Sequence, residues 1–317
     1  MPSISTTLRG ILTAFLGFAL FSSHDSLIKA LGGTYSVFQL IFFINLFSFI
    51  PMTITMLVDR RVDNFRPHHP WLILIRSCLM ILAMTSAFYA FAVLPLTQVY
   101  ALLFATPLLV TILSVPLLGE TVRAQRWAAV AVGLVGVIVV LRPGYTELTL
   151  GHLAALTAAF ASAFASIVIR KIGSEERSAV LILYPLILSV AIMGSMLPLV
   201  YEPVKLNHLA MMAAIALLSV FAQHCIIGAY RVAAAALIAP LQYSQIIWAS
   251  IFGILFFAEK PDTFVLAGSS IIIASGLFVV WRESRTEVSA RTPVLKTPNL
   301  RFDTGTSPKP KHRKEQS

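Results

Sequence analysis

The sequence predicts an all-α integral membrane protein of ten transmembrane helices, arranged as two inverted five-helix repeats around a central cavity. Of its 317 residues, 57% are hydrophobic and only 12% are charged, whereas a soluble domain carries about 25% charged residues. The hydrophobic residues gather in stretches long enough to cross a bilayer, and the second half of the chain repeats features of the first. Because each repeat has an odd number of spans, the two copies must cross the membrane in opposite directions.

Each predicted span comes close to the roughly 20 mostly apolar residues that the hydrocarbon core requires. Lipid cannot satisfy exposed backbone N–H and C=O groups, so each span must be a helix. The first stretch is expected to be retained rather than cleaved as a signal peptide, because its flank holds only Arg9 and the polar run Ser-Ser-His24-Asp25 follows it. In chain order the predicted spans are 11–31, 36–58, 71–93, 97–118, 125–141, 150–170, 178–200, 208–230, 235–258 and 263–282.

The repeat is visible as matching residues at a nearly constant offset. The matched pairs are Thr97–Pro107 with Ala236–Ile246, Glu120 with Glu259, and Arg142 with Arg282. Ordered matches of this kind are less easily produced by chance than apolar similarity alone. The predicted organisation is a cytoplasmic N-terminus (1–10), a first five-helix repeat (11–144), a second five-helix repeat (150–282) and a basic, disordered cytoplasmic tail (283–317).

The distribution of Lys and Arg predicts the orientation, because cytoplasmic loops carry an excess of these residues. With the N-terminus inside, the inner loops and helix ends hold Arg60, Arg61, Arg66, Arg123, Arg126, Arg170, Lys171, Arg177 and Arg231. The outer ones hold only Lys29, Arg142, Lys205 and Lys260. Both termini are therefore expected in the cytoplasm. The net charge of +10 then reflects topology rather than nucleic-acid binding.

Several motifs give the chain a family resemblance. The motifs are Arg76-Ser-Cys-Leu, Ala105-Thr-Pro107-Leu, Leu-Leu-Gly-Glu120, Gly136-Val-Ile-Val-Val-Leu-Arg-Pro-Gly144 and, in the second half, Ala-Pro240-Leu-Gln-Tyr-Ser-Gln. Over about residues 8–282, this pattern resembles the EamA family of the drug/metabolite transporter superfamily. One departure is Asn45, because many members have an Arg at the corresponding place in the second helix.

The resemblance implies two inverted repeats around a central cavity in the inner membrane, and solute movement without ATP hydrolysis. The sequence agrees, since it has no Walker-type Gly-x-x-x-x-Gly-Lys-Ser/Thr loop. Members of the family carry amino acids, nucleotide-like cofactors, vitamins such as riboflavin, or drugs. Both import and export occur among them, so the resemblance leaves the direction open.

Ionisable residues at membrane depth are costly and are candidates for function. His24 and Asp25 in the first span could bind substrate or take up a coupling proton, and the alternative is that Asp25 forms a structural pair with Lys29, four residues on. Arg76 and His224 could also bind the substrate or take part in coupling. The alternatives are that Arg76 extends to the membrane interface and that His224 hydrogen-bonds a neighbouring helix carbonyl. Glu120 and Glu259, at equivalent helix ends, suggest gates or structural contacts.

The ninth span is the richest in groups suited to a cavity. Pro240 interrupts the helical hydrogen bonds, and the following residues supply amide, hydroxyl and aromatic groups: Gln242, Tyr243, Ser244, Gln245 and Trp248. On an α-helix, Ser244, Gln245 and Trp248 would share one face. Further walls are expected from Tyr89, Tyr100, Asn45, Gln39, Gln98 and Thr106. The alternative is that these polar groups only join helices, as the small residues at 133, 136 and 158–165 are expected to do.

The favoured function is a secondary transporter. The neutral, aromatic ninth span, together with the riboflavin importers in the family that the chain resembles, suggests riboflavin or a similar vitamin moving inward. An exporter of amino acids or other metabolites is the alternative within that class. A membrane-embedded enzyme is the alternative of another class, and the sequence lacks His-Glu-x-x-His and Gly-x-Ser-x-Gly motifs. A channel is a third. We expect no cofactor, metal or nucleic acid; the expected partners are a small-molecule substrate and the lipid bilayer, with the protein a monomer or homodimer.

Overall fold

The computed structural model describes residues 4–58, 66–145, 147–172, 175–176, 178–233 and 235–285. Its helices are α1 (Ile4–Gly32), α2 (Val37–Val58), α3 (Pro70–Val93), α4 (Leu96–Leu103), α5 (Thr106–Leu118), α6 (Ala124–Leu141), α7 (Leu150–Ile172), α8 (Ser178–Val200), α9 (Leu206–Val232), α10 (Ala235–Ile238), the 3-10 helix η1 (Ala239–Ser244), α11 (Gln245–Phe257) and α12 (Thr263–Arg285). The predicted tail from residue 286 onward, together with Arg60, Arg61 and Arg177, lies outside the described residues.

These helices confirm the predicted all-α fold with ten crossings. Eight of them are long and apolar enough to span a membrane, counting α4 with α5 and η1 with α11 as single crossings. Two shorter apolar helical stretches, Val37–Pro51 and Thr263–Val279, bring the number to ten. The predicted spans end within a few residues of the helices because the apolar stretches are bounded by polar loops.

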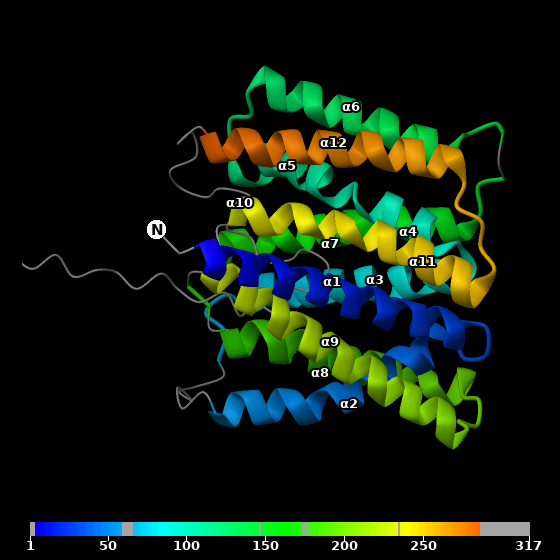
Figure 1. The fold of residues 1–317 in the computed structure, drawn as a ribbon. Helices are drawn as coiled ribbons and strands as arrows, with labels where there is room; N and C mark the ends of the chain where they lie inside the picture. The colour runs from blue at the N-terminus through cyan, green and yellow to red at the C-terminus, as the bar shows by residue number, and fades with distance from the viewer. Residues whose placement is uncertain are drawn as a thin grey trace, which may run out of the picture.

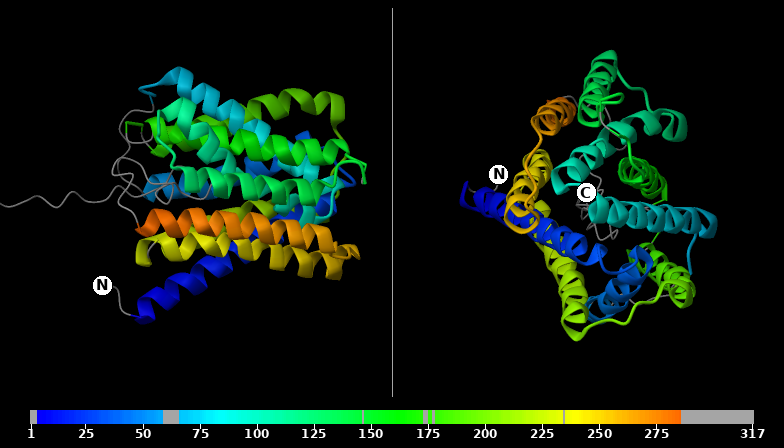
Figure 2. Two further views of the ribbon diagram at one scale, coloured as in Figure 1. Left: turned by 90° about the horizontal axis from the view of Figure 1, so that it is seen from above. Right: turned by 90° about the vertical axis from the view of Figure 1, so that its right-hand side faces the viewer.

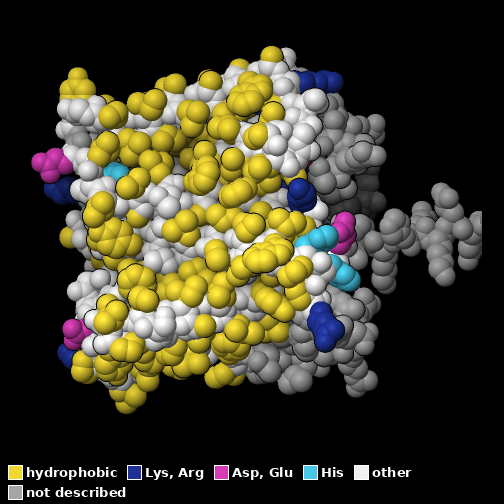
Figure 3. Space-filling view, turned by 180° about the vertical axis from the view of Figure 1, so that it is seen from behind, with side chains coloured by type: hydrophobic (Ala, Val, Ile, Leu, Met, Phe, Trp, Pro, Cys, Tyr) yellow, Lys and Arg dark blue, Asp and Glu magenta, His cyan; other side chains and the backbone are white. Residues whose placement is uncertain are grey.

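The helices run lengthwise beside one another, so that all loops lie at the two ends of the bundle (Figure 1). We call the end where α1 begins and α12 finishes the N-end, and the opposite one the far end. Seen along the helices, α6 and α12 lie at one edge of the bundle, while α2, α8 and α9 lie at the other (Figure 2). On the face seen in Figure 3, apolar side chains cover the middle of the bundle, and the charged ones lie near its two ends. This is the distribution that a bilayer requires.

The contacts between helices reveal an inverted two-repeat arrangement. The first helix of each half packs on the third helix of the other: α1 lies on α9, and α7 lies on α3. The second helices, α2 and α8, pack on each other, as do the last helices, α6 and α12. The most extensive helix contacts among the described residues therefore lie between the two repeats.

The close contact of α6 with α12 depends on small residues. A Cβ built on Gly136 would lie 2.8 Å from the carbonyl oxygen of Gly268, and one built on Gly268 would lie 2.7 Å from that of Gly136. Nearby, the Ser275 hydroxyl donates to the Ala129 carbonyl across the same interface at 2.5 Å. Small residues allow helix backbones to approach in this way in membranes.

The fourth crossing of each half ends in the same left-handed turn. Gly119 has φ of 68° after α5, and Ala258 has φ of 52° after α11. An L-residue in this region costs about 1–2 kcal/mol, which glycine avoids. We expect Ala258→Gly to raise the stability of the purified protein by about 1 kcal/mol and Gly119→Ala to lower it by a similar amount. Thermal unfolding in detergent measures both, and equal shifts of the same sign would contradict the account.

Candidate functional site

The fourth crossing of each repeat is interrupted near its middle. In the first repeat, α4 and α5 are separated at Phe104 and Ala105. Pro107 lacks the N–H that would reach the carbonyl of Leu103, and the Thr106 hydroxyl donates to that carbonyl instead at 2.7 Å. Broken helices of this kind are tolerated in a membrane where their freed backbone groups find partners inside the protein.

In the second repeat the interruption is longer. Residues Ala239–Ser244 form the 3-10 helix η1 between α10 and α11, and Pro240 again removes a backbone donor. Ser244 ends η1, whereas Gln245 and Trp248 both belong to α11, so the shared face expected for these three residues stays a prediction. Gln242 belongs to η1 and Gln245 begins α11, so two amide side chains lie three residues apart where the break ends.

A small pocket lies between the two interruptions. Four lining residues come from the first break and two from the second, with one more from α7; they are Tyr100, Leu103, Phe104, Thr106, Gln242, Gln245 and Ser162. The cavity volume is about 20 Å³, which suffices for a water molecule and not for an organic solute. In this conformation the pocket is therefore too small for an organic solute, and binding one would require the repeats to separate.

The lining of the pocket is neutral and rich in hydrogen-bonding groups. Gln245 is 1% exposed, yet its Nε2 has no hydrogen-bond partner within the described part of the chain. A buried donor left without a partner costs about 1–3 kcal/mol. Gln245 therefore contributes a buried amide donor without a described partner to the lining of the pocket.

Aromatic side chains adjoin the same pocket. Phe104 meets Tyr243 edge to face, with ring centroids 5.0 Å apart, and Tyr100 lies 6.2 Å from Phe104. Gly276 of α12 leaves room for the Tyr243 hydroxyl, because a Cβ at position 276 would overlap it. The pocket therefore combines amide groups with the faces and edges of aromatic rings.

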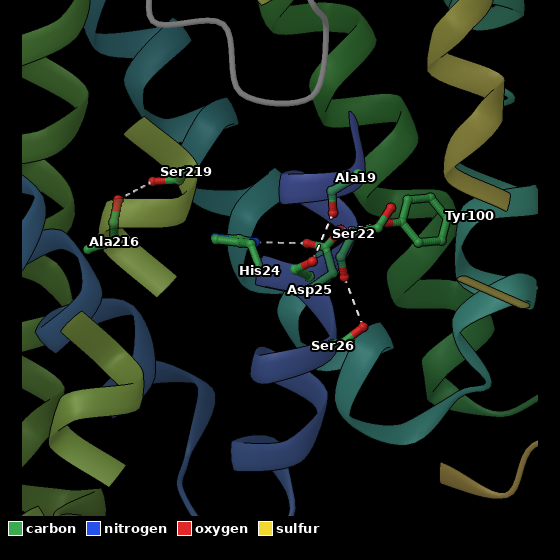
Figure 4. A network of polar contacts seen from close by, with 9 residues as sticks. Ala19, Ser22, His24, Asp25, Ser26, Tyr100, Ala216 and Ser219 are labelled. Atoms are coloured by element: carbon green, nitrogen blue, oxygen red, sulfur yellow. Dashed lines mark hydrogen bonds and ion pairs between the residues drawn. The ribbon is translucent and has the colours of Figure 1, made fainter. Parts of the chain in front are cut away.

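A buried acidic side chain lies behind Tyr100. Asp25 is fully buried, and its Oδ2 accepts a hydrogen bond from the Tyr100 hydroxyl. Its Oδ1 lies 3.0 Å from Nδ1 of His24, which is itself 2% exposed. The Tyr100 hydroxyl also lies 3.1 Å from Oγ of Ser22. His24 and Tyr100 approach this network from opposite sides (Figure 4). Tyr100 thus contacts both the pocket and the carboxylate.

The alternative pairing of Asp25 with Lys29 is wrong. The Lys29 Nζ lies 2.8 Å from Oε1 of Glu259 and donates to the carbonyl of Leu94 at 2.6 Å. The spacing of four residues allows a pair on α1, but tertiary packing brings Glu259 to Lys29 and Tyr100 to Asp25. At the N-end, Glu120 makes the corresponding contact with Arg170.

The remaining predicted residues lie away from the pocket lining. Arg76 is buried and donates to the Leu181 carbonyl at 2.7 Å, and Asn45 donates to Oγ of Ser189 at 2.7 Å. Both contacts join a first-repeat helix to α8. His224 is exposed and contacts the Val220 carbonyl of its own helix, and Tyr89 is 36% exposed.

Two other predicted wall residues make contacts elsewhere: Gln39 bonds the backbone of Glu202, and Gln98 bonds His152. Trp248 packs against Phe15 and Phe252, with centroids 5.4 and 6.0 Å away. Thus Tyr100, Gln242, Gln245 and Thr106 meet at the pocket, whereas Trp248 supports the contact of α11 with α1.

Sequence reasoning missed three lining residues, Leu103, Phe104 and Ser162. Phe104 was detectable in principle, because Pro107 marks a break about one helical turn before it. Ser162 lies in the small-residue run 158–165, which predicts packing only, and nothing in its local sequence points to a cavity. The partners Lys29 and Arg170 were also missed, since each meets its carboxylate only through contacts between the repeats.

Several known proteins are similar to this chain in sequence. The chain is 26% identical to an S-adenosylmethionine uptake transporter of Rickettsia prowazekii over 284 residues, covering 90% of this chain and 96% of that protein. It is 27% identical to a riboflavin transporter of Rhizobium johnstonii over 223 residues, covering 70% and 74%. It is 28% identical to a pseudopaline exporter of Pseudomonas aeruginosa over 274 residues, covering 84% and 94%.

The fold is also found among solved structures. A crystal structure with 18% sequence identity superposes with a TM-score of 0.57, covering 89% of this chain and 98% of its own. At that identity the likeness concerns the fold alone. The sequence profile of the EamA-like transporter family matches the chain twice, over residues 8–142 and 149–281. Since the two matches take up most of the chain, this multi-pass membrane protein belongs to the EamA-like transporter family.

Proposed function

We propose that the protein is a secondary transporter that takes up a flat, hydrogen-bonding heterocyclic solute, with riboflavin as the leading candidate. The observation that carries this proposal is the neutral pocket between the broken fourth crossings of the two repeats. Secondary transporters bind solutes near the membrane midplane, at discontinuous helices where the repeats meet. Rocking of the repeats about this pocket would expose it to one side of the membrane at a time.

The chemistry of the lining supports a heterocyclic solute. No Lys, Arg, Asp or Glu is among the residues that line the pocket, so a small anion finds no counter-charge there. Gln242 and Gln245 offer amide donors and acceptors, and Phe104 and Tyr243 offer aromatic contacts worth about 0.5–1.5 kcal/mol each beyond their buried area. Riboflavin combines a flat nitrogen heterocycle with a hydroxylated chain, and S-adenosylmethionine shares this combination as adenine with ribose.

The relatives named above provide evidence on the direction of transport and on the class of protein. Two of the three named above take up or transport such heterocyclic compounds, whereas the third is an exporter. All are transporters, which favours transport over the alternative of a membrane-embedded enzyme. The exporter among them keeps metabolite export as the second candidate for this chain.

We propose that Asp25 and His24 form the coupling site, through which a proton drives uptake. A buried acidic residue at membrane depth marks function by default. Its contact with Tyr100 supports coupling in particular, because the same hydroxyl lines the solute pocket. Protonation of Asp25 would weaken its hydrogen bond with the Tyr100 hydroxyl, so that this hydroxyl could contact the solute. Loss of the proton would restore the hydrogen bond. Lys29, the nearest cation along α1, is engaged by Glu259.

We place the N-end in the cytoplasm and the protein in the inner membrane. Among the described residues, the N-end carries Arg123, Arg126, Arg170, Lys171 and Arg231, while the far end carries Lys29, Arg142, Lys205 and Lys260. The excess at the N-end agrees with the positive-inside rule. The relatives are bacterial proteins, which supports the inner membrane.

The proposal is tested by measuring uptake of labelled riboflavin in cells that lack their own riboflavin importer and express this chain. The same cells are tested separately with labelled S-adenosylmethionine. Saturable uptake above the empty-vector control is expected for riboflavin, and a proton uncoupler should reduce it. Uptake of S-adenosylmethionine alone would retain the solute class and change the substrate. Uptake of neither, with the protein present in the membrane, would refute import and direct the search to efflux from preloaded vesicles.

A further inference from the structure

We propose that Lys29 and Arg170 are gate residues, each holding one end of the transport path closed through an ion pair with a glutamate of the other repeat. The inference rests on the proposed alternating access but not on the identity of the solute. From the sequence, Lys29 is interpreted as a structural partner of Asp25, and Arg170 as a marker of membrane topology. The two pairs are Lys29 with Glu259 and Arg170 with Glu120.

The far-end pair joins three elements. Lys29 is in the last turn of α1, in the first repeat, and Glu259 follows α11, in the second. Their side chains are only 12% and 16% exposed. The same two side chains also hold the α3–α4 connection: Lys29 donates to the Leu94 carbonyl at 2.6 Å, and Glu259 accepts from the Leu96 N–H at 3.0 Å. Separation of α1 from α11 would break the whole set.

The N-end pair has the same design. Arg170 is in the last turn of α7, in the second repeat, and its Nη2 lies 2.5 Å from Oε1 of Glu120, which follows α5 in the first. The side chain of Arg170 is 4% exposed and that of Glu120 is 17% exposed. Arg126, at the start of α6, also interacts electrostatically with both. Here α7 and α5 cannot separate without breaking the pair.

The two pairs are equivalent under the inverted repeat. In each, the first helix of one repeat supplies the cation, and the fourth crossing of the other supplies the carboxylate. Each carboxylate is aimed by the same backbone turn: a left-handed residue, Gly119 or Ala258, precedes it. The amide of Glu120 returns to the Ser114 carbonyl at 3.4 Å, and that of Glu259 to Gly253 at 2.9 Å, a helix-ending pattern of the Schellman type.

The positions of the pairs suit gates. The pair of Lys29 with Glu259 lies at the far end of the bundle, and the pair of Arg170 with Glu120 lies at the N-end. The pocket lies between them, at the helix breaks near the middle. Removing one member of a shielded ion pair leaves an uncompensated charge, which strongly disfavours the paired arrangement. Weakening one pair should therefore favour the conformation open at that end. Both pairs are formed in this structure, in keeping with the small volume of its pocket.

The test measures how readily a thiol in the pocket reacts from outside the cell. Ser162→Cys supplies the thiol, in a background where Cys78 and Cys225 are replaced by Ala, and an impermeant maleimide is the probe. Glu259→Gln and Glu120→Gln are the matched variants, because each removes one charge and keeps a hydrogen-bond acceptor. We expect the first to raise the labelling rate about fivefold or more and the second to lower it by a similar factor.

The charge-swapped variants complete the design. Lys29→Glu with Glu259→Lys, and Glu120→Arg with Arg170→Glu, should return the labelling rate toward that of the parent if the pairing itself matters. Shifts of the same sign in the two Gln variants, or no shift in protein that elutes as a single species, would overturn the gate proposal. Because labelling requires no solute, a failed riboflavin assay leaves this test valid. Riboflavin uptake with unshifted labelling would refute the gates alone.

Discussion

Replacing Asp25 with Asn is expected to abolish accumulation of the solute against its gradient while exchange across the membrane continues. A proton that crosses 100 mV releases about 2.3 kcal/mol, and since about 1.4 kcal/mol corresponds to tenfold, one proton per solute supports a gradient of about 50-fold. Asn has nearly the shape of Asp but cannot carry that proton. The internal solute concentration in the variant should therefore reach only the external one.

Energised membrane vesicles measure accumulation, and counterflow in unenergised vesicles measures exchange. Asp262→Asn is the matched control. Asp262 lies in the loop before α12, where burial would raise the pKa of its carboxyl, but hydrogen bonds from the Phe264 N–H and Arg142, and the charge of Arg142, lower that pKa below its usual value. Asp262 thus stays ionised and should not couple. Accumulation by Asp25→Asn that still collapses with an uncoupler would refute the coupling site.

Replacing Gln245 with Leu is expected to raise the KM for the solute about tenfold, because the pocket loses a donor that has no partner among the described residues. A hydrogen bond of about 1.4 kcal/mol corresponds to this factor. The stability of the protein should be unchanged or slightly higher, since no internal hydrogen bond is lost at Nε2. If Gln245 served only in packing, the substitution would change the stability of the protein and leave the KM unaltered. Measuring both quantities therefore distinguishes a binding role from a packing role.

Gln223→Leu is the matched control for that variant. Gln223 is also a buried glutamine of the membrane region with an atom, Oε1, that has no partner among the described residues. It lies on α9 and does not line the pocket. The control should leave the KM unaltered. An equal rise in KM for both variants would show that the Gln245 effect is a general consequence of removing a buried amide.

The helices were predictable because their cause is local. A run of apolar residues must leave water, and in lipid it must satisfy its own backbone groups, so the ten spans follow from composition and length. The matching of Glu120 with Glu259 predicted the inverted repeats for a similar reason, since an odd number of crossings reverses the second copy. Neither argument requires a contact between distant residues.

The candidate site was predictable only in part. Pro240 and the polar residues after it indicate the second break, and the sequence alone singles out three of the lining residues, Tyr100, Gln242 and Gln245. The 3-10 conformation of residues 239–244 was not predictable, because single-residue propensities do not distinguish one further α turn from a tighter one. The packing of Trp248 against Phe15 was not predictable either, because it joins helices that lie far apart in the chain.

By itself, then, the sequence determined the membrane fold, the number of crossings and the polar character of the ninth span, since each depends on residues close together in the chain. Only the tertiary structure decided the pairings. Lys29 meets Glu259 rather than Asp25, Arg170 meets Glu120, and Tyr100 joins Asp25 to the pocket. The physical reason is that an ion or hydrogen-bond donor in a low-dielectric interior takes the best partner that packing brings within reach. Packing between inverted repeats joins residues far apart in the sequence.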